Sequence, residues 1–197
     1  VLFLALLGLT AGHIGDDARL RAVGTGVALA VLAAFAVLTL RLQMARRRPV
    51  WDPTLSFWWL GMGCLIGVAI AWALDAPGVT LGVLALAGLA VAVPSGVLYK
   101  VVPFLAWFHL QAEQVSRERW DVAVPHVKSF VSDRAAHAHF LLHAVALALL
   151  LAALAGWEET ARPAGVLFTA AAVLQGVNLA RVYLQYRKVR GLLGSAG

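Results

Sequence analysis

The chain has 197 residues, of which 61% are hydrophobic and only 13% are charged, and its mean hydropathy is +0.83. So little polar material excludes a water-facing globular surface, a disordered chain, a coiled coil and a soluble nucleic-acid binder. The net charge of +6 instead indicates topology, because Lys and Arg collect in the cytoplasmic loops of membrane proteins. We predict an integral membrane protein whose partner is the lipid bilayer, with no nucleic-acid partner.

A helix that crosses a membrane needs about 20 apolar residues. Apolar runs cover residues 1–12, 20–42, 55–74, 79–110, 140–157 and 164–186. The first run is too short for a full span, and the chain begins there without Met, so we interpret it as the end of a span in a fragment of a larger protein. The predicted fold class is an all-α polytopic bundle of about six spans, with residues 1–197 forming a single transmembrane domain.

The fourth run is too long for a perpendicular crossing, and it contains Pro94 and Pro103. Each proline removes a backbone hydrogen bond and can kink a helix. We therefore expect this helix to be tilted, to be broken near Pro94-Ser95-Gly96, or to project into the cytoplasm. In the third run, the small-residue pair Gly63 and Gly67 indicates close packing against a neighbouring helix.

Basic residues alternate between dense and sparse loops. The dense loops and the tail hold Arg41, Arg46, Arg47, Arg48, Arg117, Arg119, Lys128, Arg134, Arg187, Lys188 and Arg190, whereas the intervening loops hold Arg19, Arg21 and Arg162. Because positive charge stays on the inner side of a membrane, this alternation places the first group and the C-terminus in the cytoplasm.

A polar stripe marks the sixth run, where Gln175, Asn178, Arg181 and Gln185 recur at helical spacing. One interpretation is a lining for a ligand, for a proton path or for a cofactor carboxylate. The other is ordinary hydrogen bonding between helices, with Arg181 extending to the cytoplasmic interface.

The most interior basic residue is Lys100, which follows Tyr99 in the fourth run. Its ammonium group can bind an anionic group such as a haem propionate, or it can take part in proton transfer when neutral. The alternative is a lysine on a tilted helix that reaches the interface.

Five of the six histidines, His109, His126, His137, His139 and His143, fall between the end of the fourth run and the first turns of the fifth. His139 and His143 are four residues apart and share one side of a helix, which His109 approaches from the preceding helix. With His137 they form a candidate set of ligands for a metal or for a b-type haem. A Cys-x-x-Cys-His motif is absent from the sequence, which excludes a c-type haem in this chain. The alternative is that interfacial histidines have no ligand role.

The segment Gly96 to His109, GVLYKVVPFLAWFH, resembles a motif of twelve-helix bacterial membrane proteins related to the catalytic subunit of haem-copper oxidases and to NnrS-type haem and copper proteins. The segment Val124-Pro-His-Val-Lys-Ser-Phe, before an apolar helix, is also similar to theirs. The resemblance implies the second half of such a protein in a bacterial inner membrane, with haem or copper bound and the remaining helices or other subunits as partners. The histidines depart from the oxidase pattern, because they crowd at the inner face, so oxidase ligands do not map onto them residue by residue.

Three functions follow from these observations. The first is a haem- or metal-associated inner-membrane protein of the oxidase-like class, acting in electron transfer or in nitric oxide or oxygen handling, with His109, His139, His143, Lys100 and Arg181 as cofactor-binding residues. The second is half of a secondary transporter, based on the Pro-interrupted fourth helix, on Lys100 and on the polar stripe of Gln175, Asn178 and Arg181. The third is a structural subunit of a membrane complex. Whether the protein is an enzyme does not follow from the sequence.

Overall fold

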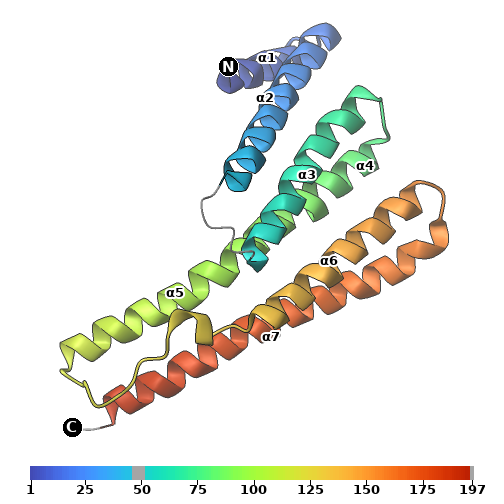
Figure 1. Ribbon diagram of the computed structural model, residues 1–197. Helices are drawn as coiled ribbons and strands as arrows, with labels where there is room; N and C mark the ends of the chain where they lie inside the picture. The colour runs from blue at the N-terminus through green and yellow to red at the C-terminus, as the bar shows by residue number, and fades with distance from the viewer. Residues whose placement is uncertain (46–51, 196–197) are drawn as a thin grey trace. The chain divides into compact units, whose positions relative to one another are not determined.

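A computed structural model describes residues 1–45 and 52–195 of the chain. These residues are mainly helical and include no strand, which confirms the predicted all-α class. The main helices, labelled in Figure 1, are α1 (Leu2–Ile14), α2 (Ala18–Met44), α3 (Pro53–Ala73), α4 (Gly78–Val83), α5 (Ala92–Ser116), α6 (Asp133–Leu154) and α7 (Ala161–Gly194). The π-helical segment η1 (Leu84–Val91) joins α4 to α5, and the short 3-10 helices η2 (Val127–Ser129) and η3 (Glu158–Thr160) precede α6 and α7.

Within the described residues, 5 helical segments are long and apolar enough to cross a membrane: Ala18–Met44, Pro53–Ala73, Gly78–Ser116, Asp133–Leu154 and Glu158–Gly194. This confirms a multi-pass membrane protein. Helix α1 has 13 residues and rises only about 20 Å, which is less than the ~30 Å of a bilayer core, as predicted for the first run. Arg46, Arg47 and Arg48, which contribute to the predicted orientation, lie outside the described residues.

The described residues form two compact units. Unit 1 takes the described part of residues 1–50 together with residues 58–92, and unit 2 takes the described part of residues 51–57 and 93–197. Each unit is described by itself below. The single transmembrane domain over residues 1–197 stays a prediction.

Unit 1 contains a tight helical hairpin of α1 and α2. Asp17 caps α2, because its carboxylate accepts hydrogen bonds from the backbone N–H groups of Arg19 and Leu20 at 2.9 and 3.1 Å. The helices approach most closely at two glycines, since a Cβ atom on Gly12 would lie 2.7 Å from the backbone nitrogen of Arg21, and one on Gly24 would lie 2.7 Å from that of Leu9. Close packing in unit 1 thus depends on glycines of the hairpin.

The glycines of α3 behave differently from the prediction. A Cβ on Gly63 would meet no described atom within 4 Å, so the expectation of close packing there is wrong. A Cβ on Gly67 would make an ordinary contact of 3.5 Å with the side chain of Leu84. The four-residue spacing of two glycines does not by itself show which face of the helix packs against another helix.

The fourth span is one continuous helical segment of 39 residues from Gly78 to Ser116. Of the three alternatives predicted from the sequence, the break near Pro94-Ser95-Gly96 is therefore excluded, and a tilted or projecting helix remains. Pro94 has no N–H and its ring crowds the carbonyl four residues earlier, in the last turn of η1. The π-helical segment η1 ends at Val91, three residues before this proline, and the helix continues through Pro94 as α5.

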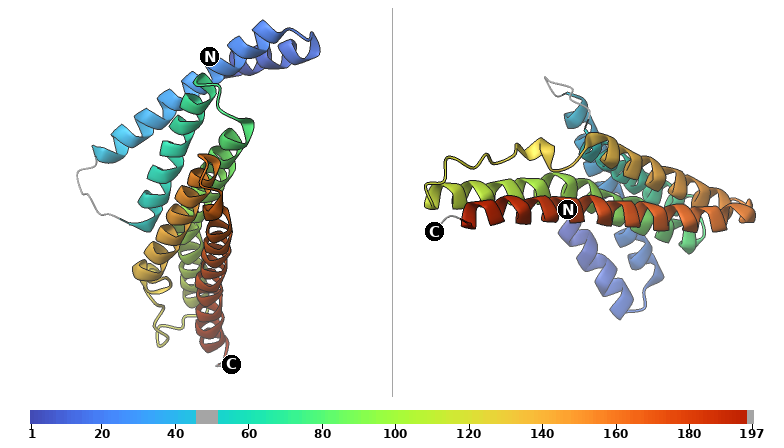
Figure 2. Two further views of the ribbon diagram at one scale, coloured as in Figure 1. Left: turned by 90° about the vertical axis from the view of Figure 1, so that its right-hand side faces the viewer. Right: turned by 90° about the horizontal axis from the view of Figure 1, so that it is seen from below.

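In unit 2, α6 and α7 pack as an antiparallel pair (Figure 2). Helix α6 has 22 residues and a length of about 33 Å, which matches a bilayer core. Helix α7 has 34 residues and a length of about 51 Å, so it continues past the start of α6. We call this part of unit 2 the extension: α5 from Val101, the connecting segment to Ser132, and α7 from Val182.

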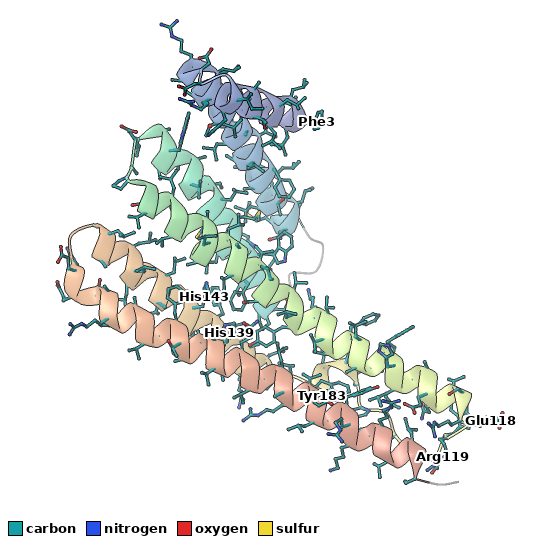
Figure 3. The ribbon with its side chains drawn as sticks, turned by 180° about the vertical axis from the view of Figure 1, so that it is seen from behind. Phe3, Glu118, Arg119, His139, His143 and Tyr183 are labelled. Carbon is teal, nitrogen blue, oxygen red and sulfur yellow. The ribbon has the colours of Figure 1, made fainter. Side chains whose placement is uncertain are left out.

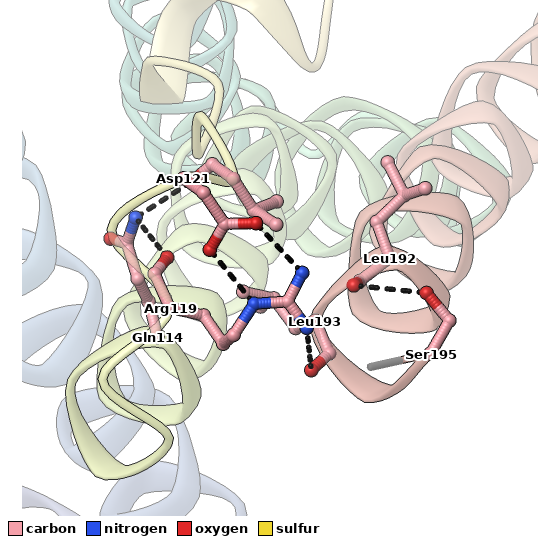
Figure 4. A network of polar contacts seen from close by, with 7 residues as sticks. Gln114, Arg119, Asp121, Leu192, Leu193 and Ser195 are labelled. Atoms are coloured by element: carbon pink, nitrogen blue, oxygen red, sulfur yellow. Dashed lines mark hydrogen bonds and ion pairs between the residues drawn. The ribbon is translucent and has the colours of Figure 1, made fainter. Parts of the chain in front are cut away.

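The extension has its own hydrophobic core. Its buried members are Leu110, Phe130, Val182, Val189 and Leu193. The connecting segment covers this core and is tied to both helices: Gln114 Nε2 donates to the carbonyl of Val122 at 2.7 Å, and Arg119 donates to that of Leu193 at 3.4 Å (Figure 4). Helix α6 begins after Ser132.

Candidate functional site

The centre of unit 2 holds a buried pair of histidines on α6. His139 and His143 are each 2% exposed, and Figure 3 shows both on the inner side of their helix. Ala136, Ala146 and Leu147 are buried with them, because residues three and four apart share one face of a helix. The apolar periodicity of α6 thus carries two imidazoles into the interior.

Aromatic rings enclose the two imidazoles. The ring centre of Phe57, at the start of α3, lies 4.9 Å from that of His139 and 5.9 Å from that of His143. Phe168 of α7 packs edge-on against His143 at 5.2 Å. The two imidazole centres are 6.3 Å apart. This packing keeps both rings in an apolar setting.

A hydrogen-bonded chain orients His139. Asn178 Nδ2 donates to the hydroxyl oxygen of Tyr99 at 3.1 Å and lies 3.4 Å from the carbonyl oxygen of Ala135, which assigns this atom as the amide nitrogen. The Tyr99 oxygen lies 3.1 Å from Nδ1 of His139. The tyrosine oxygen has two lone pairs, so beside Asn178 it either accepts from an Nδ1–H of His139 or donates its own hydrogen to Nδ1, depending on the imidazole tautomer.

A second polar contact lies one turn before Asn178 in α7. Ser95 donates to Oε1 of Gln175 at 3.2 Å. Nε2 of Gln175 is a buried nitrogen without a hydrogen-bond partner among the described residues. Two members of the predicted stripe, Gln175 and Asn178, thus face the interior, whereas Arg181 is exposed. The exposure of Arg181 agrees with the interpretation that it reaches the interface.

The other predicted histidine ligands lie apart from this pair. Nδ1 of His109, an exposed residue of the extension, lies 2.7 Å from the carbonyl oxygen of Leu105 in its own helix. Nδ1 of His137 lies 2.8 Å from the carbonyl oxygen of Asp133. In residues 1–45 and 52–195, no group of three or more His, Cys, Asp or Glu side chains is placed to hold a metal ion. Only His139 and His143 of the four predicted ligands come together.

Lys100 has an acidic partner that the sequence pattern did not reveal. Its ammonium nitrogen lies 2.9 Å from a carboxylate oxygen of Asp52, and the other carboxylate oxygen accepts from the N–H of Leu55 at 2.8 Å. Asp52 stands just before the third apolar run, so a search within the runs misses it. The pair borders a cavity of about 220 Å³ that Tyr99 and Asp133 also line. Lys100 therefore does not contact the histidine pair directly, and Tyr99 lies between the cavity and His139.

Phe57 is the second residue that sequence reasoning missed. It is fully buried and contacts His139 and His143, yet within an apolar run it has no distinguishing pattern. Gly96 allows this approach, because a Cβ there would lie 2.7 Å from Cβ of Phe57. The hydroxyl of Thr54 donates to the carbonyl of Gly96 at 2.9 Å and holds the two helices at this crossing.

No protein-family model, curated protein or solved structure matches the chain. The resemblance to oxidase-related and NnrS-type proteins therefore stays a prediction, and the buried cluster in unit 2 is the basis for a functional proposal.

Proposed function

We propose that unit 2 binds a copper ion through His139 and His143, and that the protein is a metal-associated membrane protein of the oxidase-like class that handles electrons, nitric oxide or oxygen. The observation that carries this proposal is the burial of two imidazoles side by side, each 2% exposed, inside a helical unit of membrane-spanning length. Polar and ionisable groups inside a membrane are costly and are usually retained for function.

The spacing of the rings favours a small ion over a haem. Two residues of one helix cannot take opposite faces of a haem, because the macrocycle would have to pass through their own backbone. Metal bonds to imidazole nitrogens are about 2.0 Å long, so an ion between two rings separates their centres by roughly 6 Å when the bonds are nearly opposite. The measured separation of 6.3 Å fits this arrangement. Two-coordinate binding by nitrogen ligands is typical of Cu(I), and copper is among the metals that imidazole suits.

Tyr99 and Asn178 would position the ligand His139. Nδ1 of His139 is engaged by Tyr99, so Nε2 is the nitrogen that would hold the ion, with the imidazole proton on Nδ1 and donated to the Tyr99 oxygen. Metal-bound histidines usually have a hydrogen-bond partner on the other ring nitrogen, which sets the orientation and the tautomer. When bound, copper would supply a one-electron redox centre. The residues of this chain would supply the apolar enclosure and the fixed orientation of the imidazole.

Copper content of the purified full chain tests the proposal. We expect about one copper per chain by elemental analysis after loading with Cu(I), and at least about ten-fold weaker binding after His143→Leu or His139→Leu, since each removes one of two ligands. His137→Leu and His109→Leu are matched controls, because their imidazoles lie outside the buried pair, and they should retain copper. Thermal unfolding monitors the fold of each variant.

Retention of copper by the double variant His139→Leu/His143→Leu would overturn the proposal. A Soret band that the same double variant abolishes would replace copper with haem. Protein with neither copper nor haem would favour the structural subunit. The continuous fourth span removes one of the observations behind the transporter alternative, and Lys100 with its partner Asp52 and the polar stripe of α7 remain as its support.

A further inference from the structure

A second site lies in the extension, away from the histidine pair. It is a pocket of about 380 Å³ between α5 and α7, lined by Glu113, Arg117, Tyr183, Tyr186, Arg187, Arg190, Gly191 and Gly194. We propose that this pocket binds a phosphate group, carried by a lipid of the adjacent leaflet or by a soluble phosphate compound. The proposal does not depend on copper binding.

The charges of the pocket leave a net positive site. Glu113 accepts from Arg117 at 2.9 Å and from Arg190 at 3.0 Å, so one carboxylate links arginines of two helices. Arg187 has no carboxylate within ion-pair distance in the described part of the chain. Three guanidinium groups thus face one carboxylate. Each guanidinium has five N–H donors in a planar fork that matches phosphate oxygens, and a single ion pair engages only some of them.

Tyrosines hold two of the arginines in place. The guanidinium carbon of Arg187 lies 5.9 Å from the ring centre of Tyr183, and that of Arg190 lies 6.0 Å from that of Tyr186. Each pair is four residues apart on α7, so the ring and the guanidinium lie on one face of the helix. Arginines that are held in this way lose less conformational freedom when they bind an anion.

Two glycines provide room between the arginines. Gly191 and Gly194 stand one turn after Arg187 and Arg190 on α7. A Cβ on Gly191 would meet no described atom within 4 Å, and one on Gly194 would first meet the guanidinium of Arg117 at 3.9 Å. Neither glycine is required for helix packing, and a glycine lowers helix stability, so packing does not account for them. Because these two positions have no side chain, they leave space in the pocket between the arginines.

The position of the pocket along α7 suits either source of phosphate. Arg190 lies about 44 Å along α7 from its start, whereas the hydrocarbon core is about 30 Å thick and the headgroup layers bring the bilayer to about 45 Å. Counted from a start of α7 at the far edge of the hydrocarbon core, the pocket extends from the headgroup layer at Tyr183, about 33 Å along the helix, into the water beyond it, so lipid phosphates and soluble anions are both within reach. By the distribution of basic residues, it lies on the cytoplasmic side.

Calorimetric titration of pyrophosphate into the full chain in phosphatidylcholine nanodiscs tests the proposal. We expect saturable binding that weakens with salt and falls at least about ten-fold in Arg187→Gln/Arg190→Gln. Lys188→Gln is the matched control, because it removes an exposed charge of the same helix outside the pocket, and it should change the affinity less than about two-fold. Gly191→Leu should also abolish binding while the thermal midpoint is maintained, because its side chain enters open space.

Nanodiscs that contain phosphatidylglycerol distinguish the two sources. Lipid occupancy predicts loss of pyrophosphate binding in these discs, together with phosphatidylglycerol that native mass spectrometry finds on the wild type and not on the double arginine variant. A soluble ligand predicts equal pyrophosphate affinity in both discs. The proposal is overturned if the wild type binds neither probe, or if Lys188→Gln weakens binding as much as the double variant does. Neither result bears on copper binding by the histidine pair.

Discussion

The two ends of unit 2 are built with opposite arrangements of polar and apolar groups. At the histidine pair, Asn178, Tyr99 and His139 form a polar chain inside an apolar unit. In the extension, Leu110 and Leu193 are buried under a surface that carries Arg117, Arg187 and other charges. Helices α5 and α7 contribute to both regions. The choice between a polar and an apolar interior therefore depends on what surrounds these two helices at each end, and not on which helices are present.

The extension begins at Val182, about 31 Å along α7, which is the thickness of a hydrocarbon core, so we expect lipid around the histidine pair and water around the extension. In lipid, burial of apolar surface between helices gains little, because lipid tails are as apolar as leucine, and close packing and hydrogen bonds matter more. In water, removal of apolar surface from solvent is the main driving force. Substitutions in the two regions should therefore cost different amounts for different reasons.

The largest effect is expected in the core of the extension. Leu110→Ala removes a fully buried side chain, and a Leu to Ala change in a water-exposed domain costs about 2–5 kcal/mol. Limited proteolysis should cut the connecting segment much faster in this variant. Leu105→Ala on the same helix is the control, because that side chain is 44% exposed. Equal cleavage rates for the two variants would contradict a water-facing core.

Gly96→Leu should have the next largest effect, and it acts on the membrane part. A Cβ at this position would lie 2.7 Å from Cβ of Phe57 and 3.1 Å from the backbone oxygen of Thr54, so the two helices must separate. Overpacking of this kind costs about 1–3 kcal/mol. Thermal unfolding in detergent micelles measures the loss. Gly191→Leu in the extension should not lower the midpoint, and a similar loss in both would contradict the packing at Gly96.

A pair of Tyr→Phe substitutions compares hydroxyl groups in the two regions. Tyr99→Phe removes the link between Asn178 and His139 and should cost about 1 kcal/mol, because it leaves buried polar groups without a partner. Tyr183→Phe should cost almost nothing, since that residue is 58% exposed. The difference between the two thermal midpoints is the measurement. Two equal midpoints would show that the hydrogen-bonded chain does not stabilise unit 2.

The smallest effect concerns pH and the connecting segment. The guanidinium of Arg119 donates to Asp121 at 2.8 and 2.9 Å and lowers the pKa of that carboxyl below its ordinary value (Figure 4). A lowered pKa in the folded state stabilises the fold above the ordinary carboxyl pKa, and the contribution disappears as the pH falls through the lowered value. The wild type and Asp121→Asn should therefore differ slightly in proteolysis of the connecting segment at pH 7, and the difference should disappear once the pH is below the lowered pKa of Asp121. A difference that persists at low pH would show that Asp121 acts without its charge.

Sequence patterns predicted the helices better than they predicted the neighbours of each helix. Apolar runs located every span among the described residues, because the length of a span follows from the thickness of the bilayer. The proline pair suggested a break, yet the helix continues from η1 through Pro94 into α5, and this depends on backbone geometry that composition does not reveal. Gly63 and Gly96 are the same residue type, and only the fold shows that a Cβ would meet open space at Gly63 and would collide with Phe57 at Gly96.

In the candidate site too, the sequence predicted which residues share a helical face but did not predict which residues of different helices meet. The spacing of His139 and His143 placed both on one helical face, and the stripe on α7 included Asn178. The sequence could not show that Tyr99 joins these two elements or that Phe57 packs on both imidazoles, because these contacts connect residues far apart in the chain. It also could not separate His109 from the pair, since exposure depends on which elements cover a helix.

The sequence by itself determined the class of this protein, the number and position of its long apolar helices and the polar residues that they carry. These properties are local, because hydropathy and helical period act within one segment. The tertiary structure decided which polar residues meet, that Asp52 pairs with Lys100, and that arginines of α5 and α7 converge on Glu113. Such encounters depend on how helices pack against one another, and a single helix carries no information about its partner's position.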